Sequence, residues 1–248
     1  MNLLIDAGNS RIKWALCDDA TWTVGQPFEW SGDQLDRQLA AQFVELPQVR
    51  MAWISNVGGP LVEEALRRVL NKKIASENMH FVRSAPRLGG IVNLYTDPTR
   101  LGVDRLIAMV AAFQRYRAPV CVADCGTALT VDLVDADGHF RGGIIAPGPM
   151  LMRRSLASGT RQLPTVDDRN SDVLALSTEH GIAAGCVRAA AGAIALAYAE
   201  FSKRLGVTPH CILTGGDAPL VLPSLSFAYD HDPDLVLKGL ALLVDGLT

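Results

Sequence analysis

The sequence predicts an α/β fold made of two duplicated halves. Three observations support it: a repeated strand-turn-strand motif, helical spacing in each half, and glycine-containing turns after further apolar runs. Residues 3–5 are an apolar run that ends in Asp6-Ala7-Gly8-Asn9-Ser10, and an apolar pattern resumes at residue 12. The same arrangement returns around Asp124-Cys125-Gly126-Thr127-Ala128. Apolar runs on both sides of a polar, glycine-containing turn are typical of consecutive strands. The recurrence of the Asp-x-Gly core indicates an internal duplication.

Each half also carries segments with helical apolar spacing. In the first half these are residues 61–70 and 103–116, and in the second half they are residues 181–205 and 234–244. Strands and helices that alternate along the chain favour an α/β architecture in both halves.

The boundary between the halves is expected at residues 115–119. A helical pattern ends there in charged residues, and Pro119 precedes the next strand. We therefore expect domains at residues 1–116 and 117–248. No low-complexity linker separates them, so we expect them to pack directly against each other around a cleft.

The composition indicates a globular protein without a strong overall charge. The 248 residues are 49% hydrophobic and 20% charged, which is enough apolar material for a sizeable core. The 23 Lys and Arg against 26 Asp and Glu give a net charge of −3, and the pI is about 5.9. No global positive field attracts nucleic acid or an anionic membrane, so neither is an expected partner.

Cysteine spacing and the apolar segments favour a cytoplasmic location. The five cysteines are scattered, and no two have the Cys-x-x-Cys spacing of a zinc or redox site. Such a set of cysteines is typical of reduced thiols. The N-terminal segment reaches Asp6 before a signal-peptide core develops. Residues 182–199 contain Arg188 and are rich in Ala and Gly, so we interpret them as a closely packed helix and not as a membrane span.

The first Asp-x-Gly turn has the residue types of a phosphate site. Gly8 permits a tight turn with accessible backbone N–H groups, Asn9 and Ser10 add donors, and Lys13 follows on the next strand. A plain hairpin turn, in which Asp6 and Asn9 bond their own backbone, is the alternative. The same Asp-x-Gly core recurs at Asp124, which favours the interpretation that two turns bind phosphate together. Neither a P-loop nor a Gly-x-Gly-x-x-Gly motif is present in the sequence.

Two further glycine motifs and one charged pair have two interpretations each. Residues 142–148 and 214–218 either shape a ligand site or are ordinary turns. Asp104 and Arg105 stand at a helix start, with Tyr95 nine positions before Asp104. They could be a cap and a solvated charge, or a proton acceptor and an anion-holding guanidinium. Spacing alone leaves both open.

Taken together, these motifs resemble the type III pantothenate kinases, also known as Bvg accessory factors, of the actin, sugar kinase and Hsp70 superfamily. The resemblance covers essentially the whole chain. It rests on Asp6-x-Gly8-Asn9-Ser10 with Lys13, Gly102-x-Asp104-Arg105, Asp124-x-Gly126-Thr127-Ala128-x-Thr130-x-Asp132, Gly142-Gly143-x-Ile145-x-Pro147-Gly148 and Thr214-Gly215-Gly216. It implies two ribonuclease-H-like (actin-like ATPase) domains with a central cleft.

The resemblance also implies an activity, namely transfer of the ATP γ-phosphate to pantothenate in the first step of coenzyme A synthesis. Asp104 would be the catalytic base. ATP, with Mg²⁺, would be bound by Asp6, Gly8, Asn9, Ser10, Lys13, Gly126, Thr127, Gly215 and Gly216. The family's monovalent cation, K⁺ or NH₄⁺, would be held by Asp124.

For pantothenate the resemblance implies Tyr95, Gly102, Val103, Asp104, Arg105 and Thr178. Ser177 or Thr178 could equally be the N-cap of the following helix. Family members are homodimers, and the small-residue helix could pack at such an interface. Two alternatives remain: another small-molecule kinase or phosphatase of the superfamily, or a non-catalytic regulator. The Tyr95 and Gly102–Arg105 spacing argues against the first, and the lack of a basic face argues against a DNA-binding regulator.

Overall fold

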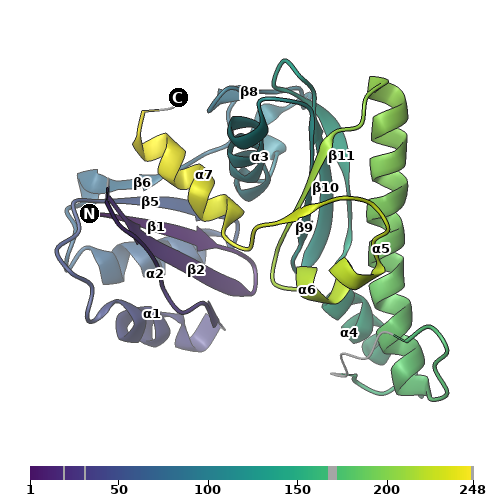
Figure 1. Ribbon diagram of the computed structural model, residues 1–248. Coiled ribbons are helices and arrows are strands. Elements are labelled where there is room, and N and C mark those ends of the chain that lie inside the picture. Colours follow the sequence, from purple (N-terminus) through teal and green to yellow (C-terminus); the bar gives the residue numbers. More distant parts are fainter. Residues whose placement is uncertain (19, 31, 167–171, 247–248) are drawn as a thin grey trace. The chain divides into compact units, whose positions relative to one another are not determined.

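The structure is a computed structural model that describes residues 1–18, 20–30, 32–166 and 172–246 (Figure 1). It comprises two compact units. Unit 1 contains Met1–Ala111 and Asp234–Thr248, and unit 2 contains Ala112–Pro233. Each unit holds a β-sheet with helices against it, which confirms the predicted α/β class.

The sheet of unit 1 is built around its first strand. Its order is β3 (Trp22–Val24), β2 (Arg11–Cys17), β1 (Asn2–Ala7), β5 (Met51–Asn56) and β6 (Met79–Phe81), and β4 (Phe28–Glu29) also pairs with β2. β1 runs antiparallel to β2 and parallel to β5. β1 is a central strand, and its residues are buried on both faces because helices cover both faces of the sheet.

Helices cover both faces of this sheet (Figure 1). α1 (Leu35–Phe43) and α2 (Pro60–Leu70) share one core with the side chains of Leu3, Ile5 and Ile54. α7 (Leu235–Val244) contacts β1, β2 and β5. A hairpin of β7 (Arg87–Leu88) and β8 (Ile91–Asn93) precedes α3 (Val103–Tyr116) in the chain.

Unit 2 repeats the pattern of a parallel pair next to an antiparallel pair. Its strands follow the order β13 (Asp230–His231), β12 (His210–Thr214), β9 (Val120–Cys125), β10 (Ala128–Val134) and β11 (His139–Pro147). β9 is parallel to β12 and antiparallel to β10, as β1 is to β5 and β2. The duplicated turns therefore follow equivalent central strands.

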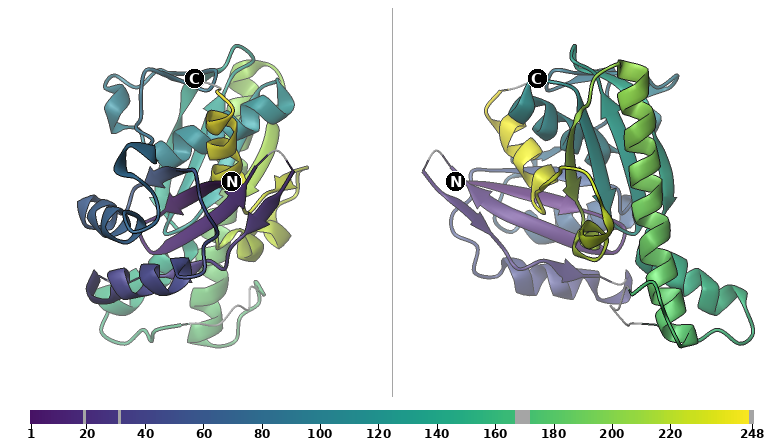
Figure 2. Two further views of the ribbon diagram at one scale, coloured as in Figure 1. Left: turned by 90° about the vertical axis from the view of Figure 1, so that its left-hand side faces the viewer. Right: turned by 45° about the vertical axis from the view of Figure 1, so that its right-hand side comes forward.

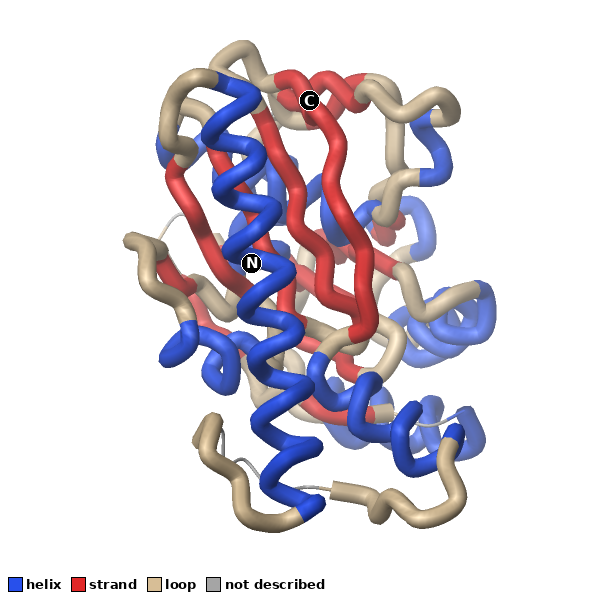
Figure 3. The backbone as a smooth tube through the Cα atoms, turned by 90° about the vertical axis from the view of Figure 1, so that its right-hand side faces the viewer, coloured by secondary structure: helices blue, strands red, loops and turns tan. Residues whose placement is uncertain are grey.

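The described residues of unit 2 include the helices α4 (Pro149–Gly159), α5 (Thr178–Leu205) and the short α6 (Ala218–Val221). α5 lies against one face of the sheet and contacts β9, β10 and β11 (Figures 2 and 3). Ala190, Ala191 and Ile194 of this helix share a core with the sheet. By length and composition α5 could also cross a membrane, but a core helix passes the same test, and half of its apolar window is buried within the chain.

The four helices expected from periodicity are all present, with ends within three residues of the expected ones. The interpretation of residues 142–148 as a turn was wrong for most of its length. Gly142 and Gly143 lie inside β11, which pairs with β10 through residue 147. The pairing register shifts at Leu133/Val134, so the glycines mark an irregular strand.

The units differ from the expected residue ranges at the C-terminus. The range 117–248 placed the last helix with the second half, whereas residues from Asp234 onward belong to unit 1. The physical reason is that α7 packs against the sheet of unit 1. A Cβ atom at Gly239 would lie 2.3 Å from the Ile107 carbonyl oxygen, so α7 also approaches the α3 backbone closely.

Candidate active site

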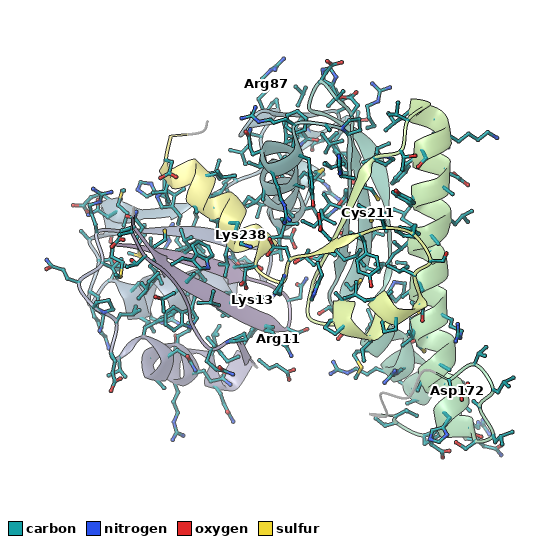
Figure 4. The ribbon with its side chains drawn as sticks, viewed as in Figure 1. Arg11, Lys13, Arg87, Asp172, Cys211 and Lys238 are labelled. Carbon is teal, nitrogen blue, oxygen red and sulfur yellow. The ribbon has the colours of Figure 1, made fainter. Side chains whose placement is uncertain are left out.

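The turn between β1 and β2 brings the first set of candidate residues together. Asp6 and Lys13 are directly opposite each other in the antiparallel register. The Gly8 N–H donates to the Arg11 carbonyl (3.0 Å), which closes the turn, and Asn9 at its tip is exposed. Figure 4 labels Arg11 and Lys13, which both lie on β2.

Two other segments hold this turn in place. The N–H groups of Val57 and Gly58 donate to the Ala7 carbonyl (3.0 and 3.2 Å). The Trp30 indole Nε1 donates to the Gly8 carbonyl (3.0 Å). Sequence reasoning missed Trp30, because it lies in a connection far from the motif and carries no local signal.

Asp104 lies in the first turn of α3, partly buried. Its Oδ1 accepts a hydrogen bond from the Arg105 backbone N–H (2.8 Å). Burial raises the pKa of the Asp104 carboxyl, and the bond from Arg105 and the Arg105 charge oppose this rise. A Cβ atom at Gly102 would lie 2.6 Å from Oδ1, so only glycine leaves the carboxylate in this position.

Arg105 and Tyr95 form a pair beside Asp104. The Arg105 Nη1 donates to the Tyr95 hydroxyl (3.1 Å), and the guanidinium carbon lies 5.9 Å from the centre of the Tyr95 ring. Arg105 is only 8% exposed, although it carries a full charge. A guanidinium retained in such a buried position is typical of a group that binds an anion or a carboxylate.

The loop that carries Tyr95 is held by a residue that sequence reasoning missed. Asn93 is buried; its Oδ1 accepts from the Tyr95 N–H (3.1 Å) and its Nδ2 donates to the Pro98 carbonyl (3.0 Å). The only signal in the sequence is an amide side chain at the end of an apolar strand. Asn93 positions Tyr95 without belonging to the expected site.

In unit 2 the second Asp-x-Gly turn is closed by a similar hydrogen bond, although it is one residue shorter than the first. The Gly126 N–H donates to the Ala128 carbonyl (3.1 Å), as Gly8 does to Arg11. The Gly148 N–H donates to the Thr127 carbonyl (2.9 Å), which joins the end of β11 to the turn. The structure therefore brings Asp124, Gly126 and Thr127 together at one end of the unit 2 sheet.

The turn after β12 reaches the same end of the sheet. Gly215 has a φ of +94°, and a Cβ atom there would lie 2.4 Å from the Asp124 Oδ1. A side chain at this position would therefore be strained and would collide with the carboxylate. Gly216, which follows, is exposed. Gly215 and Gly216 thus present bare backbone next to Asp124.

Thr178 makes no hydrogen bond with the other expected site residues of unit 2 that the structure describes. It is exposed at the first position of α5. Ser177 is the N-cap, because its Oγ accepts from the His180 N–H (3.2 Å). Of the two N-cap candidates, the structure therefore selects Ser177.

One further group could hold a metal ion. Asp135, Asp137 and His139 have ligand atoms within 4.8 Å of one another, in the loop after β10 and the start of β11. The Asp135 Oδ1 already accepts the N–H groups of Asp137 and His139 (3.0 and 2.9 Å), so the group has a structural role in the hairpin loop.

Comparison with known protein families shows which family the chain belongs to. A family model described as "Type III pantothenate kinase" matches residues 2–200. The chain belongs to the type III pantothenate kinase family. A type III pantothenate kinase from Burkholderia mallei (strain SAVP1) is 37% identical over 258 residues, which cover 98% of both chains. Kinases of this family transfer phosphate from ATP to an alcohol, and family membership supports ATP-dependent phosphorylation of pantothenate in coenzyme A synthesis.

Solved structures show the same fold. A Campylobacter jejuni protein assigned to the Baf family of transcriptional activators aligns with a TM-score of 0.56 at 19% identity and covers 98% of both chains. A ROK family glucokinase from Streptomyces griseus, solved with glucose and AMPPNP, aligns with a TM-score of 0.54 at 12% identity over 98% of both chains. The fold of this type III pantothenate kinase family member is that of the sugar kinases and actin-like ATPases, as expected.

Proposed function

We propose that in this chain Asp104 accepts the proton of the pantothenate hydroxyl while the ATP γ-phosphate is transferred to its oxygen. The observation that carries the proposal is the half-buried Asp104 carboxyl beside the Arg105 and Tyr95 pair. Burial raises the pKa of Asp104, which makes the carboxylate a stronger base than an exposed one. The reaction leaves 4′-phosphopantothenate and ADP.

Pantothenate is an anion, so its recognition requires a cation. Arg105 offers a fixed fork of donors that suits a carboxylate, and Tyr95 fixes its orientation. Phosphoryl transfer passes through a loose transition state, so positioning contributes more than the strength of the base. Gly102 and Val103 belong to the same segment and shape the substrate site around Asp104.

We assign the ATP phosphates to the two Asp-x-Gly turns and the Gly215–Gly216 segment. Asn9, Ser10 and Lys13 supply donors in unit 1, and Thr127 supplies a hydroxyl in unit 2. The kinase family implies a divalent metal with ATP, and we propose Mg²⁺. Carboxylate oxygens suit hard cations, so Asp124 is the proposed ligand of the monovalent cation, K⁺ or NH₄⁺.

We also propose that the protein is a cytoplasmic homodimer that pairs through α5. Gly181, Gly185 and Gly192 lie on the exposed side of this helix, with open space where a Cβ would be. Leu196 continues this side and is 64% exposed. Small residues permit close approach of two helices, and an exposed leucine supplies apolar area to bury. Thr178, at the start of α5, is proposed as a pantothenate contact.

The proposal is tested by a pantothenate phosphorylation assay on the purified protein with ATP and Mg²⁺, in potassium and in sodium buffer. We expect product in potassium and little in sodium. Absence of product in potassium would contradict the substrate assignment. Equal activity in sodium would contradict only the role of Asp124. The same assay with a sugar in place of pantothenate tests the alternative. Phosphorylation of the sugar and not of pantothenate would indicate another small-molecule kinase of the superfamily.

A further inference from the structure

A buried hydroxyl opposite Asp6 makes no hydrogen bond within the described residues. Ser55, on β5, is directly opposite Asp6 in the parallel register of β1 and β5. It is 0% exposed, and its Oγ has no hydrogen-bond partner among the described residues. A buried hydroxyl without a partner loses its bonds to water and gains nothing in return. A serine in this position therefore indicates a polar group that arrives with a ligand.

The register places Ser55 on the same face of the sheet as Asp6. Opposite residues of neighbouring strands point to the same side, and alternate residues point to opposite sides. Ile5 and Ile54 share the core formed with α1 and α2. Asp6 and Ser55, each one position further along, therefore face the other side, where α7 packs against β1 and β5.

The charge of Asp6 determines what kind of ligand fits there. An ionised carboxylate only accepts hydrogen bonds, and it repels phosphate oxygens unless a cation lies between them. Asp6 is next to the turn that we assign to the phosphates of ATP, and Lys13 is opposite it. The divalent metal that accompanies ATP supplies such a cation, so the residues present fit a metal site.

Ser55 is too deeply buried to be a direct ligand of an ion at the surface of the turn. Mg²⁺ dehydrates reluctantly and keeps several bound waters, which donate hydrogen bonds to nearby acceptors. A hydroxyl can accept such a bond, and groups that bond to metal-bound water tune metal affinity. In unit 2 the buried Thr130 also lies opposite an Asp-x-Gly aspartate, Asp124, and its Oγ1 has no partner among the described residues, but it lies on the antiparallel neighbouring strand and not on the parallel one.

We infer that Ser55 is a positioning residue of the nucleotide-metal site: its hydroxyl accepts a hydrogen bond from a water of the divalent metal that Asp6 binds. This inference rests on the proposed function, because it needs ATP phosphates at the Asp6 turn. Ser55 carries no signal in the sequence, since only the pairing of β1 with β5 brings it to Asp6.

The test is a calorimetric titration of ADP into the purified protein, with and without Mg²⁺. Ser55→Ala removes the hydroxyl, and Ser55→Cys keeps nearly the same shape with a much weaker hydrogen-bonding group. We expect both variants to weaken binding of ADP with Mg²⁺ by about 10-fold and to leave binding of metal-free ADP unchanged. If the alanine variant does not fold, the comparison of ADP binding with and without Mg²⁺ is made on Ser55→Cys alone.

The matched control is Ser202→Ala, which deletes a hydroxyl that bonds to the Tyr198 carbonyl in α5 of unit 2. We expect it to bind ADP with Mg²⁺ as the wild type does. Equal weakening with and without Mg²⁺ in the Ser55 variants, or no weakening, would overturn the inference. A wild-type protein that binds no adenine nucleotide would instead contradict the proposed function.

Discussion

Arg105 donates a hydrogen bond to the Tyr95 hydroxyl across 3.1 Å, from the first turn of α3 to the loop after β8. This bond joins two segments that are ten residues apart and fixes a nearly buried guanidinium. Arg105 thus has its position set before a substrate arrives, so less ordering is needed on binding. The same segment carries Asp104, so the proposed substrate contact and the proposed base lie on one short stretch of chain.

Replacing Arg105 tests its role in holding the pantothenate carboxylate. Arg105→Lys keeps the charge but loses the planar fork, so the KM for pantothenate should rise by about 10- to 100-fold, as expected for loss of a charge-assisted hydrogen bond. The KM for ATP should not change. Steady-state kinetics with each substrate varied measure both values. A rise in both would indicate that Arg105 supports the fold of the site and not one substrate.

Asp104→Asn tests the catalytic base. An amide accepts no proton, so kcat should fall by about 100-fold, near the low end for general base catalysis because the transition state is loose. Nucleotide binding, measured by calorimetry, should be almost unchanged. An unchanged kcat would remove Asp104 from the catalytic role.

The raised pKa of Asp104 gives the wild-type enzyme a defined pH dependence. The base acts only when deprotonated, so activity should be present above the pKa of Asp104 and should be lost as the pH falls through it. Because burial raises this pKa in the free enzyme, the inflection of kcat/KM against pH, which reports the free enzyme, should lie above the ordinary aspartate value of 3.8. Asp104→Asn should lack this inflection in its residual activity.

The raised pKa of Asp104 also affects the stability of the fold, with a pH dependence opposite to that of activity. A carboxyl whose pKa is raised in the folded state binds its proton more tightly there than when unfolded. Its contribution to folding is therefore greatest at low pH and is lost as the pH rises through the folded pKa. At neutral pH the ionised Asp104 destabilises the fold, so Asp104→Asn should raise the thermal unfolding midpoint while it lowers kcat. A lower midpoint would contradict this account.

Gly102→Ala tests the close approach beside Asp104. The new Cβ would lie 2.6 Å from the Asp104 Oδ1, so the carboxylate must move. Because misplacement of a catalytic group by about 1 Å can cost about 100-fold, kcat should fall by about 10- to 100-fold. Gly159→Ala is the matched control, because a Cβ there meets nothing within 4 Å. An unchanged kcat in Gly102→Ala would show that the carboxylate position is not critical.

Local patterns predicted most elements of this fold, and long-range pairing determined the rest. The Asp-x-Gly turns were visible because each motif is contiguous, and the helices because their apolar spacing is regular. Ser55 and Trp30 gave no signal, since their importance comes from strand register and from a contact across 22 residues. Residues 142 and 143 looked like a turn because glycines dominate there, yet strand pairing with β10 overrides that preference.

The position of the last helix could not be read from its sequence for a different reason. α7 is apolar on nearly all sides, and Leu237, Leu240 and Leu243 are all buried. Such a helix indicates burial but does not identify the sheet that it covers. Its place with β1 in unit 1 follows from packing alone.

Leu196→Glu tests the proposed pairing of two chains through α5. In a dimer built on this helix, the new carboxylate would be buried without a partner, which is strongly unfavourable. In the monomer it would lie in water, because Leu196 is 64% exposed. We expect sedimentation velocity to show a dimer for the wild type and mainly monomer for Leu196→Glu, at equal concentration. Val44→Glu, at a residue of unit 1 that is 65% exposed, should remain dimeric. If both variants remain dimeric, the dimer uses a surface other than α5.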